Sequence, residues 1–289
     1  MENSVQPRTG TLYVVATPIG NLEDITYRAV RVLREAGLIA CEDTRHTRRL
    51  LDHYGIDAKL VSYHEHNEAE RAQELMQKLQ AGVNIAQVSD AGMPGVSDPG
   101  YRLIKLAIEH GIPVVPVPGA SALVAALATS GLPTDAFEFR GFQPARSGQR
   151  RTELESIRSA QHTVIFYEAP HRIREALDDV VAVLGPGRPV VIARELTKVH
   201  EEFLRGTAGE LAAQVHEREL KGEITLLIGK AAEGGQASGD VDLRARLQQI
   251  MREQNVDEKA ALKALAKERG VSKSEVYREV QRGLRRQRK

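Results

Sequence analysis

The sequence Ser89–Gly100, which reads SDAGMPGVSDPG, places three glycines, two prolines and two aspartates in twelve residues. The apolar segment Val83–Val88 precedes it, and a segment with helical spacing, Tyr101–His110, follows. This order predicts a strand, a sharp loop of small residues and a helix. Small residues let a ligand approach the backbone, and a helix N-terminus offers unpaired N–H groups. The loop is therefore either an ordinary connection or part of a ligand site.

The chain before Thr134 alternates between strand-like and helix-like segments. Strands are predicted at Thr11–Ala16, Leu38–Cys41, Lys59–Tyr63, Val83–Val88 and Ile112–Val117, with a helix after each. This alternation predicts an α/β fold, with a mostly parallel sheet and helices on both faces. Ligands of such sheets bind beyond the carboxyl ends of the strands. Four of these ends carry distinctive loops, which are Thr17–Asn21 (TPIGN), Cys41–Arg45 (CEDTR), Ser89–Gly95 (SDAGMPG) and Pro118–Ser121 (PGAS).

A second α/β domain and a helical tail are predicted to follow. The segments after Thr134 mix strands and helices less regularly, which indicates antiparallel pairs. A Gly/Ala/Ser-rich linker comes next, and then two helices, Asp257–Arg269 and Lys273–Leu284, separated by a tight turn. That layout resembles a helix-turn-helix, with Val276 facing inward. The predicted domains are therefore 1–133, 134–230 and 240–289, with 231–239 as the linker.

Positive charge is concentrated in the tail. Residues 240–289 contain 14 of the 40 Lys and Arg but 8 of the 39 Asp and Glu, so a basic tail follows a slightly acidic body. The last eight residues, RGLRRQRK, include five basic ones. The tail could be a helical packing appendage, but its charge and its turn favour contact with nucleic acid.

Several classes of protein are excluded or disfavoured. A single cysteine rules out an intrachain disulfide and any multi-cysteine metal site, and no signal-peptide core or membrane-length apolar segment is present. A cytoplasmic protein without membrane contact is therefore expected. No Gly-rich dinucleotide or P-loop motif occurs, and the strand-end loops Thr17–Asn21, Ser89–Gly95 and Pro118–Ser121 lack lysine. They suit a neutral or zwitterionic, partly apolar ligand.

Candidate metal and thiol residues favour structural roles. His64 and His66 have no second cluster of ligands in the sequence, so they are interpreted as surface histidines and no metal is expected. No activating base is evident for Cys41, which is interpreted as a buried thiol.

Charged residues at the predicted strand ends leave two interpretations open. Glu42 and Asp43 are either catalytic carboxylates or caps of the next helix. Arg45, Arg48 and Arg49 form either a phosphate-binding face or a solvated helix surface. The remaining charged residues of this kind either form structural ion pairs or bind a substrate phosphate and supply a base; they are Glu168, Arg194, Glu195, Lys221 and Glu223.

Seven motifs in register resemble those of one enzyme family. They are GTLYVVATPIGNLEDIT, CEDTRHTRRLL, SDAGMPGVSDPG, PGASALVAAL, FRGFQP, FYEAPHR and RELTKVHEE, and they cover about residues 10 to 230. The chain resembles the tetrapyrrole methylase superfamily, and within it the bacterial enzymes that methylate ribose 2′-oxygens of 16S ribosomal RNA. The basic tail resembles an extension often attached to these enzymes. One departure is Gln143, where FLP rather than FQP is expected.

The resemblance implies two α/β domains, S-adenosylmethionine in the cleft between them, and a homodimer. The implied substrate is the ribose of a cytidine in the decoding region of 16S RNA, within the assembled small subunit. The implied cofactor contacts are Pro18, Ile19, Gly20, Asn21, Asp90, Ala91, Gly92, Met93, Ser121, Ala122, Phe166, Tyr167 and Ala193.

Catalytic and RNA contacts are predicted from position and charge. Asp43, Glu195 and Glu223 are candidates for the general base because they end strands. The predicted RNA contacts are Arg45, Arg194, Lys273, Arg278, Arg282, Arg285 and Arg286. Two rival functions remain, a small-molecule tetrapyrrole methylase and a ligand-sensing regulator that binds nucleic acid. The tail has no obvious use in the first, and it would be the working part in the second.

Overall fold

The first sheet has the parallel arrangement that the alternation predicts. The computed structural model describes residues 9–231, 247–248, 250–252, 256–269 and 276. Five strands pair in the order β3-β2-β4-β1-β5, and all four pairings are parallel. The strands are β1 (Leu12–Val15), β2 (Leu38–Cys41), β3 (Leu60–Ser62), β4 (Ile85–Gln87) and β5 (Val114–Val117). Their carboxyl ends therefore meet at one edge of the sheet.

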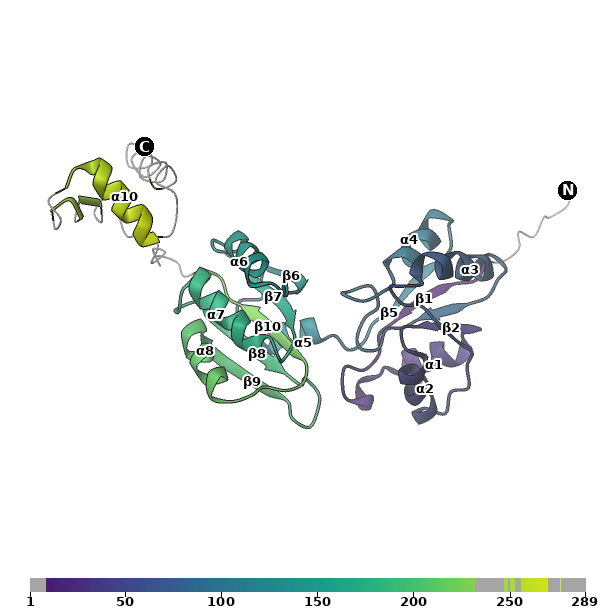
Figure 1. Cartoon of the computed structure of the whole chain (residues 1–289). Helices are drawn as coiled ribbons and strands as arrows, with labels where there is room; N and C mark the ends of the chain where they lie inside the picture. The colour runs from purple at the N-terminus through teal and green to yellow at the C-terminus, as the bar shows by residue number, and fades with distance from the viewer. Residues whose placement is uncertain (1–8, 232–246, 249, 253–255, 270–275, 277–289) are drawn as a thin grey trace, which may run out of the picture. The chain divides into compact units, whose positions relative to one another are not determined.

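Helices cover both faces of this sheet (Figure 1). The 3-10 turn η1 (Leu22–Asp24) and the helices α1 (Tyr27–Glu35) and α2 (Thr44–His53) lie on one face. The helices α3 (Glu68–Gln80) and α4 (Tyr101–Glu109) lie on the other. Each face has its own buried core: Val32, Leu33 and Leu51 contribute to the first, and Leu75 and Leu103 to the second. Apolar residues at helical spacing, buried against the sheet, hold the two layers of helices in place.

The second sheet is mixed, as predicted. Its order is β6-β7-β10-β8-β9, with β6 and β7 parallel and the other pairs antiparallel. The strands are β6 (Phe137–Phe142), β7 (Thr163–Glu168), β8 (Pro189–Arg194), β9 (Glu202–Thr207) and β10 (Ile224–Ile228). The helices α6 (Ser147–Ser156), α7 (Ile173–Leu184) and α8 (Ala208–Glu217) pack on one face. The matches with known folds described below support the α/β class.

Helix α5 (Ala122–Ser130) joins the two sheets. It follows β5 of the first sheet, but Ala126 and Leu127 pack against Ile165, Val191 and Leu227 of the second. The chain forms two compact units, Met1–Ala231 and Ala232–Lys289. The predicted boundary at residue 133 thus falls inside the first unit, beyond a helix that already belongs to the second sheet's core. The finer division into domains stays a prediction.

The loop Ser89–Gly100 is fixed at its far end by two buried contacts. Gly100 has φ of +148°, and a Cβ there would lie 2.1 Å from Nε2 of Gln87, so only glycine fits. The N–H groups of Gly100 and Arg102 both donate to Oε1 of Glu68, at 3.2 Å each. A side chain of α3 therefore occupies the start of α4. These two N–H groups are therefore not free for a ligand, because the protein's own carboxylate accepts them.

Gln143, which departs from the family motif, is buried, and its side-chain amide has no hydrogen-bond partner among the described residues. Only 2% of the residue is exposed. A buried polar group left unpaired costs about 1–3 kcal/mol. Gln143→Leu is therefore expected to raise the free energy of unfolding by about 1 kcal/mol or more, measured by urea denaturation. Gln143→Glu, which adds a charge at the same site, is the control and should destabilise the protein; a less stable leucine variant would contradict the expectation.

The second unit is described in part. Helix α10 (Glu258–Arg269) starts at Asp257, whose side chain accepts a hydrogen bond from the N–H of Ala260 at 2.7 Å. Leu262, Leu265 and Val276 share a buried cluster, so the first tail helix and the inward position of Val276 are confirmed. Most of the linker and of the second tail helix lies outside the described residues, as do five predicted RNA contacts: Lys273, Arg278, Arg282, Arg285 and Arg286. None of the helices in the described part of the chain has the length and apolarity to cross a membrane.

Candidate active site

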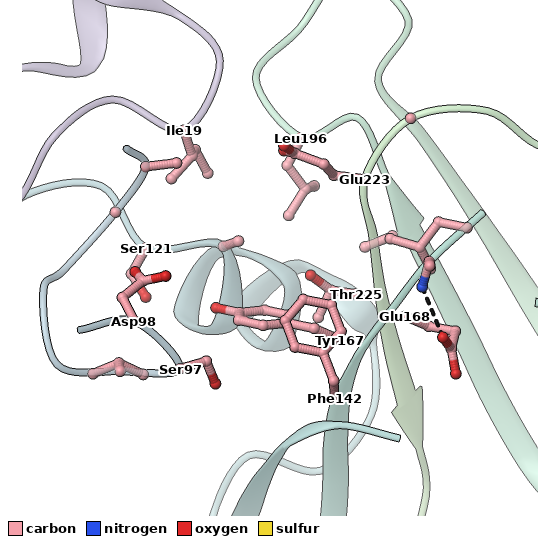
Figure 2. A pocket seen from close by; sticks show the side chains of 18 of the residues that line it. Ile19, Ser97, Asp98, Ser121, Phe142, Tyr167, Glu168, Leu196, Glu223 and Thr225 are labelled. Carbon is pink, nitrogen blue, oxygen red and sulfur yellow. Dashed lines mark hydrogen bonds between the residues drawn. The ribbon is translucent and has the colours of Figure 1, made fainter. Parts of the chain in front are cut away.

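A cavity of about 370 Å³ lies where the strand-end loops of the first sheet face the second sheet. The loops after β1, β4 and β5 form one side, and residues of β6, β7, β8 and β10 and their connections form the other (Figure 2). The lining consists of Ile19, Ala91, Gly92, Met93, Val96, Ser97, Asp98, Ser121, Ala122, Phe142, Tyr167, Glu168, Ala169, Pro170, Ala193, Leu196, Gly222, Glu223, Ile224 and Thr225. Most of these side chains are small or apolar. The predicted site at the carboxyl ends of the strands is therefore a real cavity.

The loops after β1 and β4 are tied together by their backbones. The N–H of Thr17 donates to the carbonyl of Gly92 at 2.9 Å, and the N–H of Gly92 donates to the carbonyl of Thr17 at 3.1 Å. The buried Thr17 hydroxyl also donates to the carbonyl of Ser89. These bonds pair the backbones of the two loops at Thr17 and Gly92. Beside them, the side chains of Ile19, Ala91 and Met93 line the cavity and are small or apolar, which suits a close-fitting ligand.

Most of the predicted cofactor contacts line this cavity. They are Ile19, Ala91, Gly92, Met93, Ser121, Ala122, Tyr167 and Ala193. The remaining ones, Pro18, Gly20, Asn21, Asp90 and Phe166, are not among the lining residues.

Local roles explain three of these five. The Asn21 side chain caps η1, and Oδ1 of Asp90 accepts the N–H of Asp43 at 3.1 Å. Phe166 is fully buried in the core under α6–α8, because alternate side chains of β7 point to opposite faces of the sheet. Tyr167, its neighbour, faces the cavity.

Asp98 is the carboxylate on the first-sheet side of the cavity. Burial raises its pKa to about 6, the nearby Glu42 and Asp90 carboxylates add to the rise, and a hydrogen bond with Ser89 opposes it. Burial likewise raises the pKa of Glu42, with Asp90 adding to it. No cation pairs with Asp98 within the described residues. This corner of the cavity therefore has an uncompensated negative charge.

Tyr167 faces Asp98 from the second sheet. Figure 2 shows its hydroxyl directed toward the side where Asp98 and Ser121 lie. Burial raises the pKa of Tyr167 and the Asp98 carboxylate adds to the rise, while a hydrogen bond with the backbone of Leu123 opposes it. The phenol therefore stays protonated at neutral pH, as a fixed hydrogen-bond donor beside the carboxylate.

Of the three predicted bases, only Glu223 lines the cavity. Lys198 pairs with two of the three: its Nζ lies 2.8 Å from Oε1 of Glu195 and 3.1 Å from Oε2 of Glu223. Glu195 also accepts the N–H of Glu223 at 3.0 Å, and the hydrogen bond from Lys198 is the main reason that its pKa is lowered. The side chain of Glu223 is 75% exposed. Glu195 is therefore engaged structurally, and Glu223 is a solvated acid at the rim.

Asp43 and the two described RNA candidates lie outside the cavity lining. Asp43 caps α2 by accepting the N–H of Arg45 at 2.7 Å, and this bond is the main cause of its lowered pKa. Arg45 is exposed and lies 3.6 Å from the Asp43 carboxylate. Arg194 contacts Glu202 at 3.2 Å and the carbonyl of Lys221 at 2.9 Å. The capping interpretation of Asp43 and the ion-pair interpretation of Arg194 are thus the ones that the structure favours.

Several lining residues were not singled out from the sequence. Asp98 was present in the Ser89–Gly100 loop, but its position two residues before the last glycine gave no signal of burial. Phe142 belongs to the FRGFQP motif, which indicated the family but no contact. Glu168, weighed as an ion pair, does pair with Arg172 at 2.6 Å. Val96, Ser97, Leu196 and Thr225 carry no pattern that a sequence would reveal.

The thiol interpretation agrees with the structure, whereas of the two histidines interpreted as surface residues only His66 is exposed, and Nδ1 of His64 is buried. Cys41 is fully buried, and burial raises the pKa of its thiol, which disfavours the reactive thiolate. Asn67 Nδ2 lies 3.3 Å from Nε2 of His64, in a turn that follows β3. In the described part of the chain, no three His, Cys, Asp or Glu side chains gather closely enough to hold a metal ion.

The model of one protein family matches residues 11–212, and its description is Tetrapyrrole (Corrin/Porphyrin) Methylases. The chain belongs to this family. Within it, relatives named Ribosomal RNA small subunit methyltransferase I are similar along almost their whole length. The one from Halalkalibacterium halodurans is 49% identical, covering 93% of each chain, and the one from Escherichia coli O157:H7 is 48% identical, covering 93% of this chain and 94% of its own. The Synechocystis relative is 47% identical, covering 93% and 96%.

Solved structures of distant methylases share the fold. Diphthine synthase aligns with a TM-score of 0.61 at 16% identity, covering 78% of this chain and 92% of its own. A Thermus thermophilus uroporphyrin-III C-methyltransferase, solved with S-adenosyl homocysteine, aligns with a TM-score of 0.55 at 21% identity, covering 76% and 97%. At these identities the likeness confirms the α/β methylase fold and nothing finer.

Proposed function

We propose that this methylase transfers a methyl group from S-adenosylmethionine to the ribose 2′-oxygen of a cytidine in the decoding region of 16S RNA. The observation that carries the proposal is the near-full-length similarity to relatives named Ribosomal RNA small subunit methyltransferase I. If the substrate were a tetrapyrrole, the basic residues of the tail would have no role. If the protein were a nucleic-acid-binding regulator, the cavity would catalyse no reaction.

The cavity suits this cofactor in shape and charge. Its small residues, such as Ala91, Gly92 and Ala122, leave room for a ligand against the backbone. The uncompensated carboxylate of Asp98 matches a ligand that has both a sulfonium and an ammonium group. When bound, S-adenosylmethionine supplies a methyl group that an oxygen nucleophile can displace in line. The protein's own contribution is then to position the ribose and to accept its proton.

We propose Asp98 as the group that accepts this proton, in preference to Asp43, Glu195 and Glu223. Three observations support it: Asp98 lines the cavity, no cation pairs with it among the described residues, and its pKa, raised to about 6, lies close to neutral pH, where a general base is most effective. The fixed phenol of Tyr167 can orient the hydroxyl that Asp98 deprotonates. Asp43 caps a helix, Glu195 is bound by Lys198, and Glu223 is solvated at the rim.

The function is tested by transfer of labelled methyl groups to small subunits from a strain that lacks this modification. We expect the label in a 2′-O-methylcytidine after nuclease digestion and mass spectrometry. Label that appears only in a porphyrinoid substrate would support the small-molecule methylase. Binding of S-adenosylmethionine without transfer, together with retention of specific DNA, would support the regulator.

The partners and location follow from the proposed function. Small-subunit RNA is the partner, recognised within the assembled subunit, and the protein works in the cytoplasm as a homodimer. The 2′-hydroxyl also distinguishes this substrate from DNA. Light scattering at micromolar concentration tests the dimer: a mass of about 64 kDa, twice the 31.8 kDa of the chain, is expected.

A further inference from the structure

Phe142 is an exposed aromatic side chain that lines the cavity. It is 58% exposed, although the ring of Tyr167 packs against it with centroids 5.6 Å apart in a T-shaped arrangement. Tyr167 is in turn packed by Phe139 at 4.9 Å. Phe139 and Tyr167 thus support the Phe142 ring from behind, while much of its surface remains open. Figure 2 shows the rings of Phe142 and Tyr167 together in the cavity, across from Asp98.

A bulge in β6 puts Phe142 on this face of the sheet. Phe139 pairs with Ile165, but Phe142 rather than residue 141 pairs with Tyr167, so one extra residue is inserted. Strict alternation would turn Phe142 to the face opposite Phe139, because neighbouring side chains alternate. The inserted residue reverses that outcome. Bulges of this kind commonly re-aim a side chain beside an active site.

The bulge is held against the other wall of the cavity. Gly141 has φ of +68°, and a Cβ there would lie 3.3 Å from Oγ of Ser97. Ser97 itself has φ of +61°, an unfavourable value for a residue other than glycine. A left-handed residue of the β4–α4 loop, next to Asp98 in the chain, therefore lies close to a left-handed residue of β6, next to Phe142. Such local strain concentrates at ligand clamps.

We propose that Phe142 is the platform on which the target cytosine base stacks. The inference rests on the proposed function and names the residue that positions its substrate. Enzymes and binding proteins recognise unpaired RNA bases mainly by stacking them on aromatic rings. Since Phe142 and Asp98 line the same cavity, a base on Phe142 keeps its own ribose within that cavity, on the side of the proposed proton acceptor. Phe142 is a positioning residue and takes no part in the proton transfer.

The test compares three substitutions that differ in ring character. Phe142→Ala and Phe142→Leu should each lower kcat/KM for undermethylated small subunits by about 10- to 100-fold, as expected for the loss of one stacked base. Phe142→Trp should stay within about threefold of the wild type, because a larger ring stacks at least as well. The Kd for S-adenosylmethionine, measured by calorimetry, should change less than about twofold in all three. Phe137→Ala is the matched control, since Phe137 is 48% exposed on the same strand but does not line the cavity.

Each outcome either supports or excludes stacking of the base on Phe142. If Phe142→Leu is as active as the wild type, or if Phe142→Ala is no worse than Phe137→Ala, stacking is excluded. A parallel loss of affinity for S-adenosylmethionine would assign Phe142 to the cofactor instead. Thermal melting curves show whether each variant folds. If Phe142→Ala does not fold, the comparison of Phe142→Leu and Phe142→Trp with the wild type still tests stacking. If the wild-type protein transfers no methyl group to these subunits, the proposed function fails, which is a different result from the failure of stacking alone.

Discussion

Asp98→Asn is expected to slow methyl transfer by about 100- to 10,000-fold, the usual contribution of a general base. Asparagine has nearly the same shape as aspartate but cannot accept the proton. The measurement is a single-turnover rate with saturating S-adenosylmethionine and undermethylated small subunits. Glu223→Gln is the matched comparison, because Glu223 lines the same cavity but is largely solvated. It should cost less than about tenfold.

The pH dependence gives the same prediction an independent readout. The carboxylate of Asp98 must be ionised to accept a proton, and its pKa in the free protein is raised to about 6. The profile of kcat/KM should therefore fall about tenfold per pH unit below pH 6, and the profile of kcat should fall at lower pH, because a bound cation favours the carboxylate. Asp98→Asn should abolish this limb.

Two results would contradict the assignment. An unchanged acid limb in Asp98→Asn would show that another group titrates. A loss of affinity for S-adenosylmethionine as large as the loss of rate would make Asp98 a cofactor-binding residue rather than the base.

Asp179→Ala is expected to lower the free energy of unfolding by about 3–5 kcal/mol, as for other broken buried ion pairs. Arg150 is completely buried and its Nε donates to Oδ2 of Asp179 at 2.7 Å. Ser147 and Arg151 donate to the other carboxylate oxygen, at 3.0 and 2.6 Å. Without Asp179, the remaining carboxylate beside Arg150 is the exposed Glu175 at 3.6 Å. The substitution therefore leaves a buried guanidinium that is poorly compensated.

The design of the stability experiment separates the pair from its neighbours. Asp178→Ala is the control, because Asp178 pairs with His216 on the surface, and it should cost less than about 1 kcal/mol. The double variant Arg150→Met/Asp179→Leu should recover most of the loss, since apolar residues often replace a buried ion pair without penalty. Equal effects of Asp179→Ala and Asp178→Ala in urea denaturation would exclude a special role for the buried pair.

The effect of Asp179→Ala should also depend on pH. Although burial opposes ionisation, the hydrogen bonds from Arg151, Arg150 and Ser147 hold the pKa of Asp179 below its usual value. A carboxylate whose pKa is lower in the folded protein stabilises the fold at pH values above its pKa in the unfolded chain, which is about 3.9. This stabilisation is lost as the pH falls through the pKa of the folded protein. The difference between wild type and variant should thus be full at neutral pH and shrink below about pH 4.

This pair also bears on the active site. Nη1 of Arg150 donates to the carbonyls of Pro144 and Ala145 at 3.4 Å each, and these residues lie two and three positions after Phe142 in the chain. Arg150 thus fixes the backbone that leaves the bulge. Loss of the Arg150–Asp179 ion pair should therefore lower the affinity for the small ribosomal subunit as well as the free energy of unfolding.

Local pattern was enough for the elements and for the location of the cavity. The strand Leu38–Cys41 was predicted to the residue and the tail helix Asp257–Arg269 to within one residue, because periodicity and helix-ending glycines are local signals. Four strand-end loops were candidates for a ligand site, because carboxyl ends of parallel strands share one edge of a sheet. The loops after β1, β4 and β5 line the cavity, and Cys41–Arg45 does not. These predictions needed no knowledge of distant contacts.

What the sequence determined by itself was the fold class and the family, and it made the loop Ser89–Gly100 a candidate for the ligand site. The tertiary structure placed Asp98 of that loop in the cavity lining and raised its pKa, because that pKa depends on burial and on Glu42 from another strand end. It also decided that Glu68 occupies the start of α4 and that a one-residue bulge turns Phe142 into the cavity. Burial, charge coupling and strand register are properties of segments far apart in the chain, and no local pattern encodes them.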